Sequence, residues 1–124
     1  MPGLIVADDF QPVRHRLRMF LEAKGWGPCQ EAANGAEALT LARRSKPDAV
    51  ILDYSMPVMN GVETAKAFHD EMPDVQVFMF TGHVNPAQRS LSGIPAVGVF
   101  SKDKIAPLVD ALSDCMKSVG RTTR

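Results

Sequence analysis

The segment AVILDYSMPVMNG, from Ala49 to Gly61, constrains the fold of this chain more than any other stretch. Its first four residues are apolar without interruption, a pattern typical of a strand buried on both faces of a parallel sheet. Asp53 follows that strand directly, and turn residues between Pro57 and Gly61 end it. An isolated aspartate at a strand end is more often a turn residue than a functional one, so its interpretation depends on the rest of the chain.

Three other apolar runs are predicted strands, and each leads to polar residues. They span 4–7, followed by Asp8 and Asp9; 75–80, followed by Thr81; and 97–101, followed by Lys102. The segment 29–33 is the weakest predicted strand, supported mainly by its place between two helices, and we expect it at a sheet edge. Because the carboxyl ends of parallel strands meet at one edge of a sheet, the polar residues are expected to gather there.

Helices are predicted between these strands, several of them with clear start signals. Pro12 suits the first turn of a helix, and Asn34 and Asn60 are each followed three residues later by a glutamate, as in a capping box. The fourth helix is expected to open at Asn85-Pro86 and to be short, because small and helix-breaking residues follow. Residues expected to line the buried faces of the first, third and last helices are Val13, Leu17, Phe20 and Leu21; Val62, Ala65, Phe68 and Met72; and Leu108, Leu112, Cys115, Met116 and Val119.

Strand and helix thus alternate five times, which predicts a doubly wound parallel sheet with helices on both faces. One domain over residues 1–124 is the natural interpretation, with a core at about 4–119 and a tail at 120–124. Fourteen basic residues balance fourteen acidic ones, so direct binding to nucleic acid is not expected. No apolar run approaches membrane-spanning length, which argues against membrane insertion.

Compartment is indicated by the start of the chain and by its two cysteines. The first residues lack the basic region and long apolar core of a signal peptide. Cys29 and Cys115 lie far apart in sequence, which fits a reducing compartment better than a disulfide framework. We therefore expect a cytoplasmic protein whose two cysteines do not bridge.

The polar residues at one sheet edge indicate a specific chemistry. Three crowded carboxylates, those of Asp8, Asp9 and Asp53, would repel one another unless a cation lay among them, and hard oxygen ligands suit Mg²⁺. A carboxylate is also a competent nucleophile towards phosphorus, forming an aspartyl phosphate. Lys102 and the Thr81 hydroxyl would then supply positive charge and a hydrogen bond to the phosphoryl oxygens.

The motifs LIVADDF, LDYSMPVMNG, FTG and FSK, in this order and at this spacing, resemble the receiver domain of two-component response regulators, the CheY-like family. The resemblance runs from about Leu4 to Val119. It implies a flavodoxin-like fold, with five parallel strands in the order 2-1-3-4-5 and helices on both faces.

The same resemblance implies how the site is used. Asp53 would accept a phosphoryl group from a histidine kinase or a histidine phosphotransfer protein, and a downstream protein target would read the change. The implied ligands of Mg²⁺ are Asp9 and Asp53 directly, Asp8 through water, and the backbone carbonyl of Ser55. The threonine and the lysine that follow the fourth and fifth strands would hold the phosphoryl group.

Two residues depart from the family pattern. The family commonly has Tyr or Phe three residues before the lysine, where it swings inward on phosphorylation, but here that residue is Val99. Phe100 cannot replace it by a one-residue slip, because a slip would turn every side chain of the strand to the opposite face. Asp103 stands in place of the usual proline, which resembles regulators with a DNA-binding output domain and puts in question the cis peptide bond expected there.

Without a ring at position 99, aromatic gating is not expected. We expect instead that phosphate on Asp53 pulls in the Thr81 hydroxyl and thereby orders or shifts the segment 82–95.

Other features are expected to be ordinary surface. His15 and His69 are predicted to be solvated, His83 could border the site, and the run Arg14, Arg16 and Arg18 is more often a solvated helix face than a docking patch.

The leading hypothesis is therefore a phosphorylation switch rather than an enzyme, with chemistry limited to its own phosphorylation and dephosphorylation. A phosphatase that uses Asp53 on small phosphoesters is a rival, although nothing outside the family site could recognise a substrate. A degenerate receiver that binds partners without phosphate stays open because of Val99. The chain could also be the receiver part of a longer DNA-binding regulator.

Overall fold

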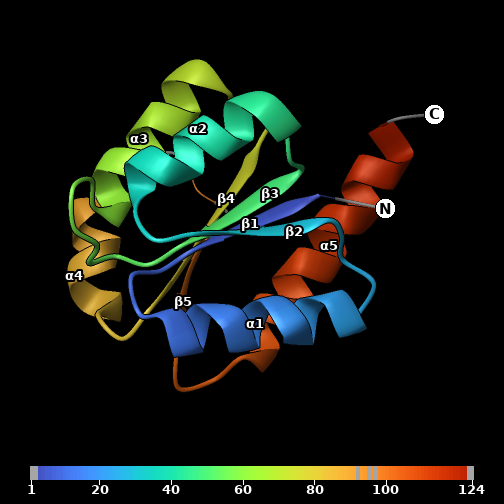
Figure 1. The fold of residues 1–124 in the computed structure, drawn as a ribbon, viewed down its shortest axis with the longest axis horizontal. Helices are drawn as coiled ribbons and strands as arrows, with labels where there is room; N and C mark the ends of the chain where they lie inside the picture. The colour runs from blue at the N-terminus through green and yellow to red at the C-terminus, as the bar shows by residue number, and fades with distance from the viewer. Residues whose placement is uncertain (1–2, 92, 95, 97, 123–124) are drawn as a thin grey trace.

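The fold is a three-layer α/β arrangement with one parallel sheet in the middle (Figure 1). The computed structural model describes residues 3–91, 93–94, 96 and 98–122, with side chains of the last helix described as far as Cys115. The strands lie in the order β2-β1-β3-β4-β5, and all neighbours are parallel, which confirms the predicted order and the edge position of the weakest strand. Their bounds are Leu4–Ala7 for β1, Cys29–Ala32 for β2, Ala49–Leu52 for β3, Gln76–Thr81 for β4 and Gly98–Ser101 for β5.

Helices cover both faces of the sheet (Figure 1). On one face, α1 and α5 pack through Leu17 and Leu112 against the inward residues of the strands. On the other face, α2, α3 and α4 pack around Phe68 and its neighbours. Their bounds are Gln11–Ala23 for α1, Gly35–Ser45 for α2, Gly61–Glu71 for α3, Val84–Ser90 for α4 and Ala106–Thr122 for α5.

The register of the central strands brings their carboxyl ends level with one another. Ala7 of β1 lies opposite Leu52 of β3, so the next residues, Asp8 and Asp53, leave the sheet side by side. The Asp53 N–H donates to the Ala7 carbonyl at 3.0 Å, which extends the pairing by one residue. Both strands are buried at every position, as expected for strands covered on both faces.

The start signals of α2 and α3 are confirmed. The Asn60 side chain accepts from the Glu63 N–H, and the Glu63 side chain accepts from the Asn60 N–H, which makes a complete capping box. Asn34 likewise accepts from the Glu37 N–H, but the Glu37 carboxylate binds the N–H of Ala33 instead of completing the box. On the buried face of α3, Ala65 and Phe68 are fully buried, whereas Val62 and Met72 are only partly buried.

The expected start of α4 was wrong. The helix begins at Val84 and not after Asn85, because the chain turns earlier, where the His83 N–H donates to the Thr81 hydroxyl oxygen at 3.0 Å. Pro86 therefore lies in the first turn, where its missing N–H costs little. The helix is as short as predicted, with seven residues. Ser92, Pro95 and Val97, which the predictions for this region also involved, lie outside the described residues.

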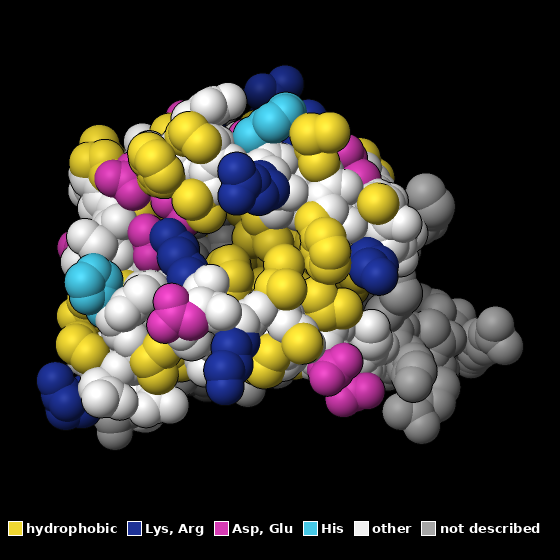
Figure 2. Space-filling view, turned by 90° about the horizontal axis from the view of Figure 1, so that it is seen from below, with side chains coloured by type: hydrophobic (Ala, Val, Ile, Leu, Met, Phe, Trp, Pro, Cys, Tyr) yellow, Lys and Arg dark blue, Asp and Glu magenta, His cyan; other side chains and the backbone are white. Residues whose placement is uncertain are grey.

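The prediction for the buried face of α1 was wrong at one residue. Leu17 and Leu21 are buried, but Phe20 is 36% exposed, and its ring lies under the Lys24 ammonium. Phe20 lines a shallow hollow on the outer face of the helix with Pro12, His15, Arg16 and Met19. Figure 2 views the side of the molecule that α1 and α5 cover, and it shows hydrophobic side chains near the centre with Lys and Arg side chains around them.

The last helix extends further than expected. It continues to Thr122, so residues 120–122 belong to α5 rather than to a tail, because no proline follows Cys115 to stop the helix. Of its predicted core residues, Leu108, Leu112 and Cys115 are buried, while Met116 and Val119 lie outside the described side chains. Within the part of the chain that the structure describes, no helix is long and apolar enough to cross a membrane.

Both cysteines are free thiols, as predicted. They are buried in the layer that α1 and α5 share with the sheet. Burial, together with the charge of Glu22, raises the pKa of the Cys29 thiol to about 11. Burial and then the charge of Asp48 raise the pKa of Cys115. Both groups are therefore protonated thiols at neutral pH.

Candidate functional site

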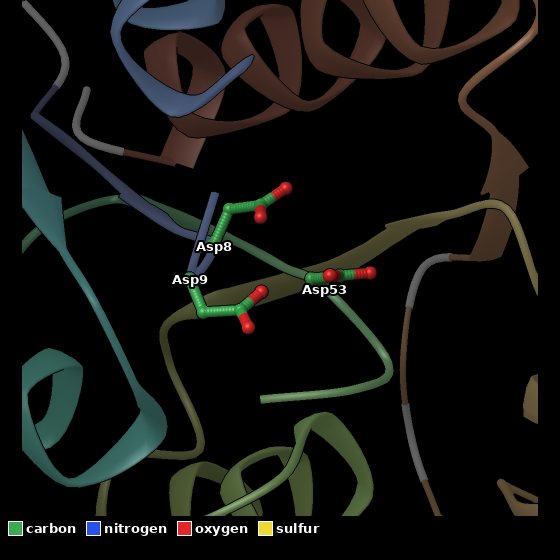
Figure 3. A group of neighbouring side chains, drawn as sticks. All are labelled: Asp8, Asp9 and Asp53. Atoms are coloured by element: carbon green, nitrogen blue, oxygen red, sulfur yellow. The ribbon is translucent and has the colours of Figure 1, made fainter. Parts of the chain in front are cut away.

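The site lies at the carboxyl edge of the sheet, where the three predicted carboxylates meet. Asp8 and Asp9 follow β1, and Asp53 follows β3. One carboxylate oxygen from each lies within 4.8 Å of the others. Figure 3 shows the three side chains projecting to the same side of the strand ends. Asp8 and Asp53 are buried, whereas Asp9 is exposed to solvent.

Lys102 joins two of these carboxylates from the end of β5. Its Nζ lies 2.6 Å from Oδ2 of Asp8 and 3.3 Å from Oδ2 of Asp53. Burial alone would lower the pKa of Lys102, but the hydrogen bond to Asp8 and the charge of Asp53 outweigh it, so the pKa is raised. The lysine is therefore a fixed positive charge between these two carboxylates.

Asp53 is the less well compensated of the two buried carboxylates. Its Oδ1 accepts from the Tyr54 N–H at 2.8 Å. Burial and then the charge of Asp8 raise the pKa of Asp53, and Lys102 and a hydrogen bond from Thr81 offset only part of this. Asp8, by comparison, holds the shorter contact to the lysine and also accepts from the Phe10 N–H at 2.9 Å. A cation bound beside Asp53 would therefore oppose both causes of its raised pKa.

Thr81 is fully buried at the end of β4. Its hydroxyl oxygen accepts from the N–H of His83. The hydroxyl proton therefore remains available to donate towards Asp53. His83, which sequence analysis placed at the border of the site, is exposed, and its ring centroid lies 6.1 Å from that of Tyr54.

The loop after Asp53 is held by a close approach to α3. A Cβ on Gly61 would lie 2.2 Å from the Asp53 carbonyl oxygen, so only glycine fits there. The Gly61 N–H donates to the Tyr54 carbonyl at 3.0 Å. Ser55 is exposed in this loop. Val58 follows with φ at 68°, bridged by a 2.6 Å hydrogen bond from the Met59 N–H to the Pro57 carbonyl.

The two departures from the family pattern have clear structural outcomes. Val99 packs with the α2, α3 and α4 layer, whereas Phe100 packs with the opposite layer, 6.2 Å from the Phe78 ring. Phe100 therefore does not take the place of an aromatic residue at position 99. Among the described residues the one cis peptide bond is Gly27–Pro28, so the bond between Lys102 and Asp103 is trans.

Sequence reasoning missed a polar cluster beside the site. Arg14, His15 and Arg18 of α1 were expected to be a solvated face, but all three lie within 3.2 Å of the Glu31 carboxylate on β2. The signal was present in the helical spacing of Arg14 and Arg18, which share one face of α1. What was missing was the partner, because Glu31 lies on the strand with the weakest pattern. Arg16 is exposed and His69 is exposed, as expected.

A second missed contact links the loop after Asp53 to α4. The Tyr54 hydroxyl lies 3.4 Å from the Ser90 Oγ near the end of that helix. Tyr54 and Ser90 also line one hollow together with Asn60 and Glu63 of the α3 start. The loop that carries the candidate acceptor therefore touches α4 near both of its ends, through His83 and Ser90.

A doubly wound sheet with buried carboxylates, threonine and lysine at one edge defines the class of phosphoryl-accepting receiver folds. The family model of the response regulator receiver domain matches residues 4–113, so the chain belongs to this family. It is a receiver domain of two-component signalling, as the motifs predicted.

Individual relatives agree with this membership. The uncharacterized transcriptional regulatory protein YhcZ of Bacillus subtilis is 37% identical over 95 residues, which cover 68% of this chain and 42% of that protein. The chain spans about half or less of the length of the curated relatives it matches. The signal receiver domain of NarL from Mycobacterium tuberculosis superposes with a TM-score of 0.83 at 31% identity, covering 94% of this chain and 96% of that one. TrrA of Thermotoga maritima, solved with Mg²⁺ and BeF, has a TM-score of 0.82 at 25% identity, covering 93% and 99% of the two chains.

Proposed function

We propose that this receiver domain takes a phosphoryl group onto Asp53 from a histidine kinase or a histidine phosphotransfer protein, and that a downstream protein reads the change. The observation that carries the proposal is the shared lysine. Lys102 lies between Asp8 and Asp53, and a third carboxylate stands beside them. This arrangement combines a nucleophile, a place for a cation and a positive charge for the transferred group.

Mg²⁺ fits the donor set of the site. Three carboxylate oxygens close together are the hard ligands that this ion prefers. An added cation would also relieve the raised pKa of Asp53. In the proposal, Asp9 and Asp53 bind the ion directly, Asp8 binds through water, and Ser55 contributes its carbonyl. When bound, Mg²⁺ would neutralise charge on the phosphoryl oxygens. The complex of TrrA with Mg²⁺ and BeF supports this assignment.

The transfer itself is a displacement at phosphorus. A carboxylate oxygen of Asp53 forms the new bond while the bond from phosphorus to the donor's imidazole nitrogen breaks. That nitrogen keeps the electron pair and takes up a proton, so the product is a neutral histidine and an aspartyl phosphate. Lys102 and the Thr81 hydroxyl would then hold two of the phosphoryl oxygens. The chemistry is limited to the domain's own phosphorylation and hydrolysis, as expected of a switch.

Residues 1–124 form one receiver domain in this proposal, and a cytoplasmic location follows from its kinase partner. The chain covers 42% of YhcZ, which is named as a transcriptional regulatory protein. This favours a second possibility for the whole protein, in which the domain regulates a DNA-binding output. The length of the complete gene distinguishes the two, and the acceptor chemistry is the same in both.

Intact-mass spectrometry after incubation with acetyl phosphate tests the proposal. With Mg²⁺ the wild-type protein should gain one phosphoryl group, and chelation with EDTA should prevent this. Asp53→Asn should not be labelled, and Asp9→Asn should be labelled more slowly because it loses a metal ligand. Full labelling of the Asp53→Asn protein would contradict the assignment. Turnover of p-nitrophenyl phosphate by the wild-type protein would instead favour a phosphatase, and partner binding without any labelling would favour a degenerate receiver.

A further inference from the structure

The polar cluster on α1 is centred on one carboxylate. The Glu31 side chain receives Arg14 Nε at 2.9 Å on Oε1, and Arg18 Nε lies 2.8 Å from Oε2. His15 Nδ1 lies 3.2 Å from the same Oε2. The Glu31 and Arg14 side chains are 19% and 14% exposed, so their contact is largely shielded from solvent, whereas Arg18 is 31% and His15 44% exposed. It fastens α1 to the edge strand β2.

Arg14 differs from the other members of this cluster by one contact. While its Nε binds Glu31, its Nη1 donates to the backbone carbonyl of Asp8 at 2.8 Å. The side chain is only 14% exposed. Because Glu31 fixes one edge of the planar guanidinium, the nitrogen that meets Asp8 has a defined position. Arg14 therefore connects the cluster directly to the turn that carries the acidic residues.

The other polar groups of Asp8, its N–H and its carboxylate, are also held by hydrogen bonds. The Asp8 N–H donates to the Ala32 carbonyl at 3.0 Å, and the Asp8 carboxylate accepts from the Phe10 N–H and from Lys102. The Asp8 carbonyl is the group between these anchors, and it belongs to the peptide unit that leads into Asp9. Its hydrogen bond to Arg14 therefore sets the orientation of the peptide from which the exposed Asp9 projects.

We propose that Arg14, oriented by Glu31, is a positioning residue for the metal-binding acidic pair Asp8 and Asp9. The inference rests on the proposed function, because it assumes that these carboxylates hold Mg²⁺. Partners that orient metal ligands without touching the metal commonly change its affinity by about 10- to 100-fold when they are removed. Loss of Arg14 should act in this way, by letting the Asp8–Asp9 peptide rotate away from the orientation in which both carboxylates face the ion.

Arg18 offers a matched control. It lies on the same helix, one turn from Arg14, and its Nε lies 2.8 Å from the same carboxylate without hydrogen-bonding geometry, and no hydrogen bond joins it to Asp8 in the described structure. Arg18→Ala removes one arm of the Glu31 cluster and so reports what weaker fastening of α1 does to the site. Arg14→Ala removes an arm and the Asp8 contact together. Arg14→Lys keeps a donor that can reach only one of the two acceptors at a time.

Mg²⁺ titration by isothermal calorimetry on the wild type and these three variants, with no phosphodonor, tests the proposal. The dissociation constant of Arg14→Ala should rise about tenfold or more, that of Arg18→Ala should stay within about twofold of wild type, and Arg14→Lys should fall between them. Urea unfolding in EDTA gives the stability of each protein separately. Equal weakening by Arg14→Ala and Arg18→Ala, or no weakening by Arg14→Ala, overturns the proposal.

Two further results keep the test decisive. If Arg14→Ala does not fold, Arg14→Lys compared with Arg18→Ala carries the test, and equal affinities in those two overturn it. If the wild-type protein neither binds Mg²⁺ nor is labelled by acetyl phosphate, the proposed function fails and takes this inference with it. If the wild-type protein binds and is labelled while Arg14→Ala matches it, only the role of Arg14 is refuted.

Discussion

The two sides of the site are built differently. On one side, β1 and β3 are buried at every residue, and α1 is fastened beside them through Glu31. On the other side, all four residues of β5 are only half-buried, and α4 has seven residues and no side-chain cap. A helix so short depends on packing for its order. We call β1, β3 and α1 the firm side, and β5 and α4 the mobile side, because a part with fewer buried contacts opens at lower free-energy cost. The carboxylates stand on the firm side, and Thr81 and Lys102 connect them to the mobile side.

Glycine substitutions should expose this difference most strongly. Gly61→Ala would place a Cβ against the Asp53 carbonyl, and we expect it to lower the free energy of unfolding by about 3 kcal/mol. Gly82→Ala, which leads into α4, would meet no atom within 4 Å and should change it by about 0.5 kcal/mol or less. Urea unfolding of both variants measures the contrast. Equal losses of unfolding free energy in the two variants would mean that the chain around Gly61 is no more tightly packed than the chain that leads into α4.

Removing the buried charge of Asp53 should stabilise the firm side. The folded pKa of Asp53 is raised, so the native state binds more protons than the unfolded chain between the two pKa values, and stability falls as pH rises through that window. Asp53→Asn should therefore be more stable than wild type at pH 7, on the order of 1 kcal/mol, when Mg²⁺ is absent.

The same comparison at lower pH is the check. As pH falls through the raised pKa of Asp53, both proteins come to carry a neutral group at position 53, so the difference in stability should shrink. Asp74→Asn, a change at an exposed aspartate, is the control and should show no such dependence. A variant at position 53 that is no more stable than wild type at pH 7 in EDTA would show that Lys102 compensates Asp53 fully.

Hydrogen exchange should locate the response to phosphorylation on the mobile side. With Mg²⁺ and beryllofluoride, peptides covering Gly82 to Pro95 should exchange several-fold more slowly, because Thr81 is drawn towards the acceptor. Peptides from α1 should change little. Val99→Tyr should add a second response in β5, since it supplies the ring that the wild type lacks. Beryllofluoride binding with unchanged exchange in the Gly82 segment would refute this readout.

The smallest expected effect concerns the contact between Tyr54 and Ser90. Tyr54→Phe and Ser90→Ala each remove one hydroxyl of a long, exposed hydrogen bond. In a double-mutant cycle on exchange protection of α4, their coupling should be about 0.5 kcal/mol in the phosphoryl-mimic state. Additive effects of the two changes would mean that the loop after Asp53 does not communicate with α4 through this pair.

The sequence predicted the firm side better than the mobile side, for physical reasons. Uninterrupted apolar runs such as β3 mark strands buried on both faces, and register then brings Asp8 and Asp53 together without further information. The start of α4 was misplaced because it depends on a tertiary turn at Thr81 that outweighs the local signal of Asn85-Pro86. Local propensity decides little where the helix is short.

The cluster around Glu31 shows a second limit. Periodicity places Arg14 and Arg18 on one face of a helix, but it does not reveal that an acidic residue of another element faces them. Phe20 shows the opposite error. Its spacing places it at the edge of the apolar face of α1, so it was predicted to be buried, but its ring lies beside Lys24 and is partly exposed. Such contacts between elements come from packing, which one-dimensional patterns describe only in part.

The burial of both thiols makes this domain convenient for site-selective chemical labelling. Maleimides and disulfide reagents react with thiolates, and Cys29 and Cys115 are buried with raised pKa values, so the folded protein should react slowly. A cysteine introduced at Val58, whose side chain is 82% exposed, would then be modified alone. That position lies in the loop after Asp53, so a single fluorophore there could report Mg²⁺ binding and phosphorylation without removal of either native cysteine.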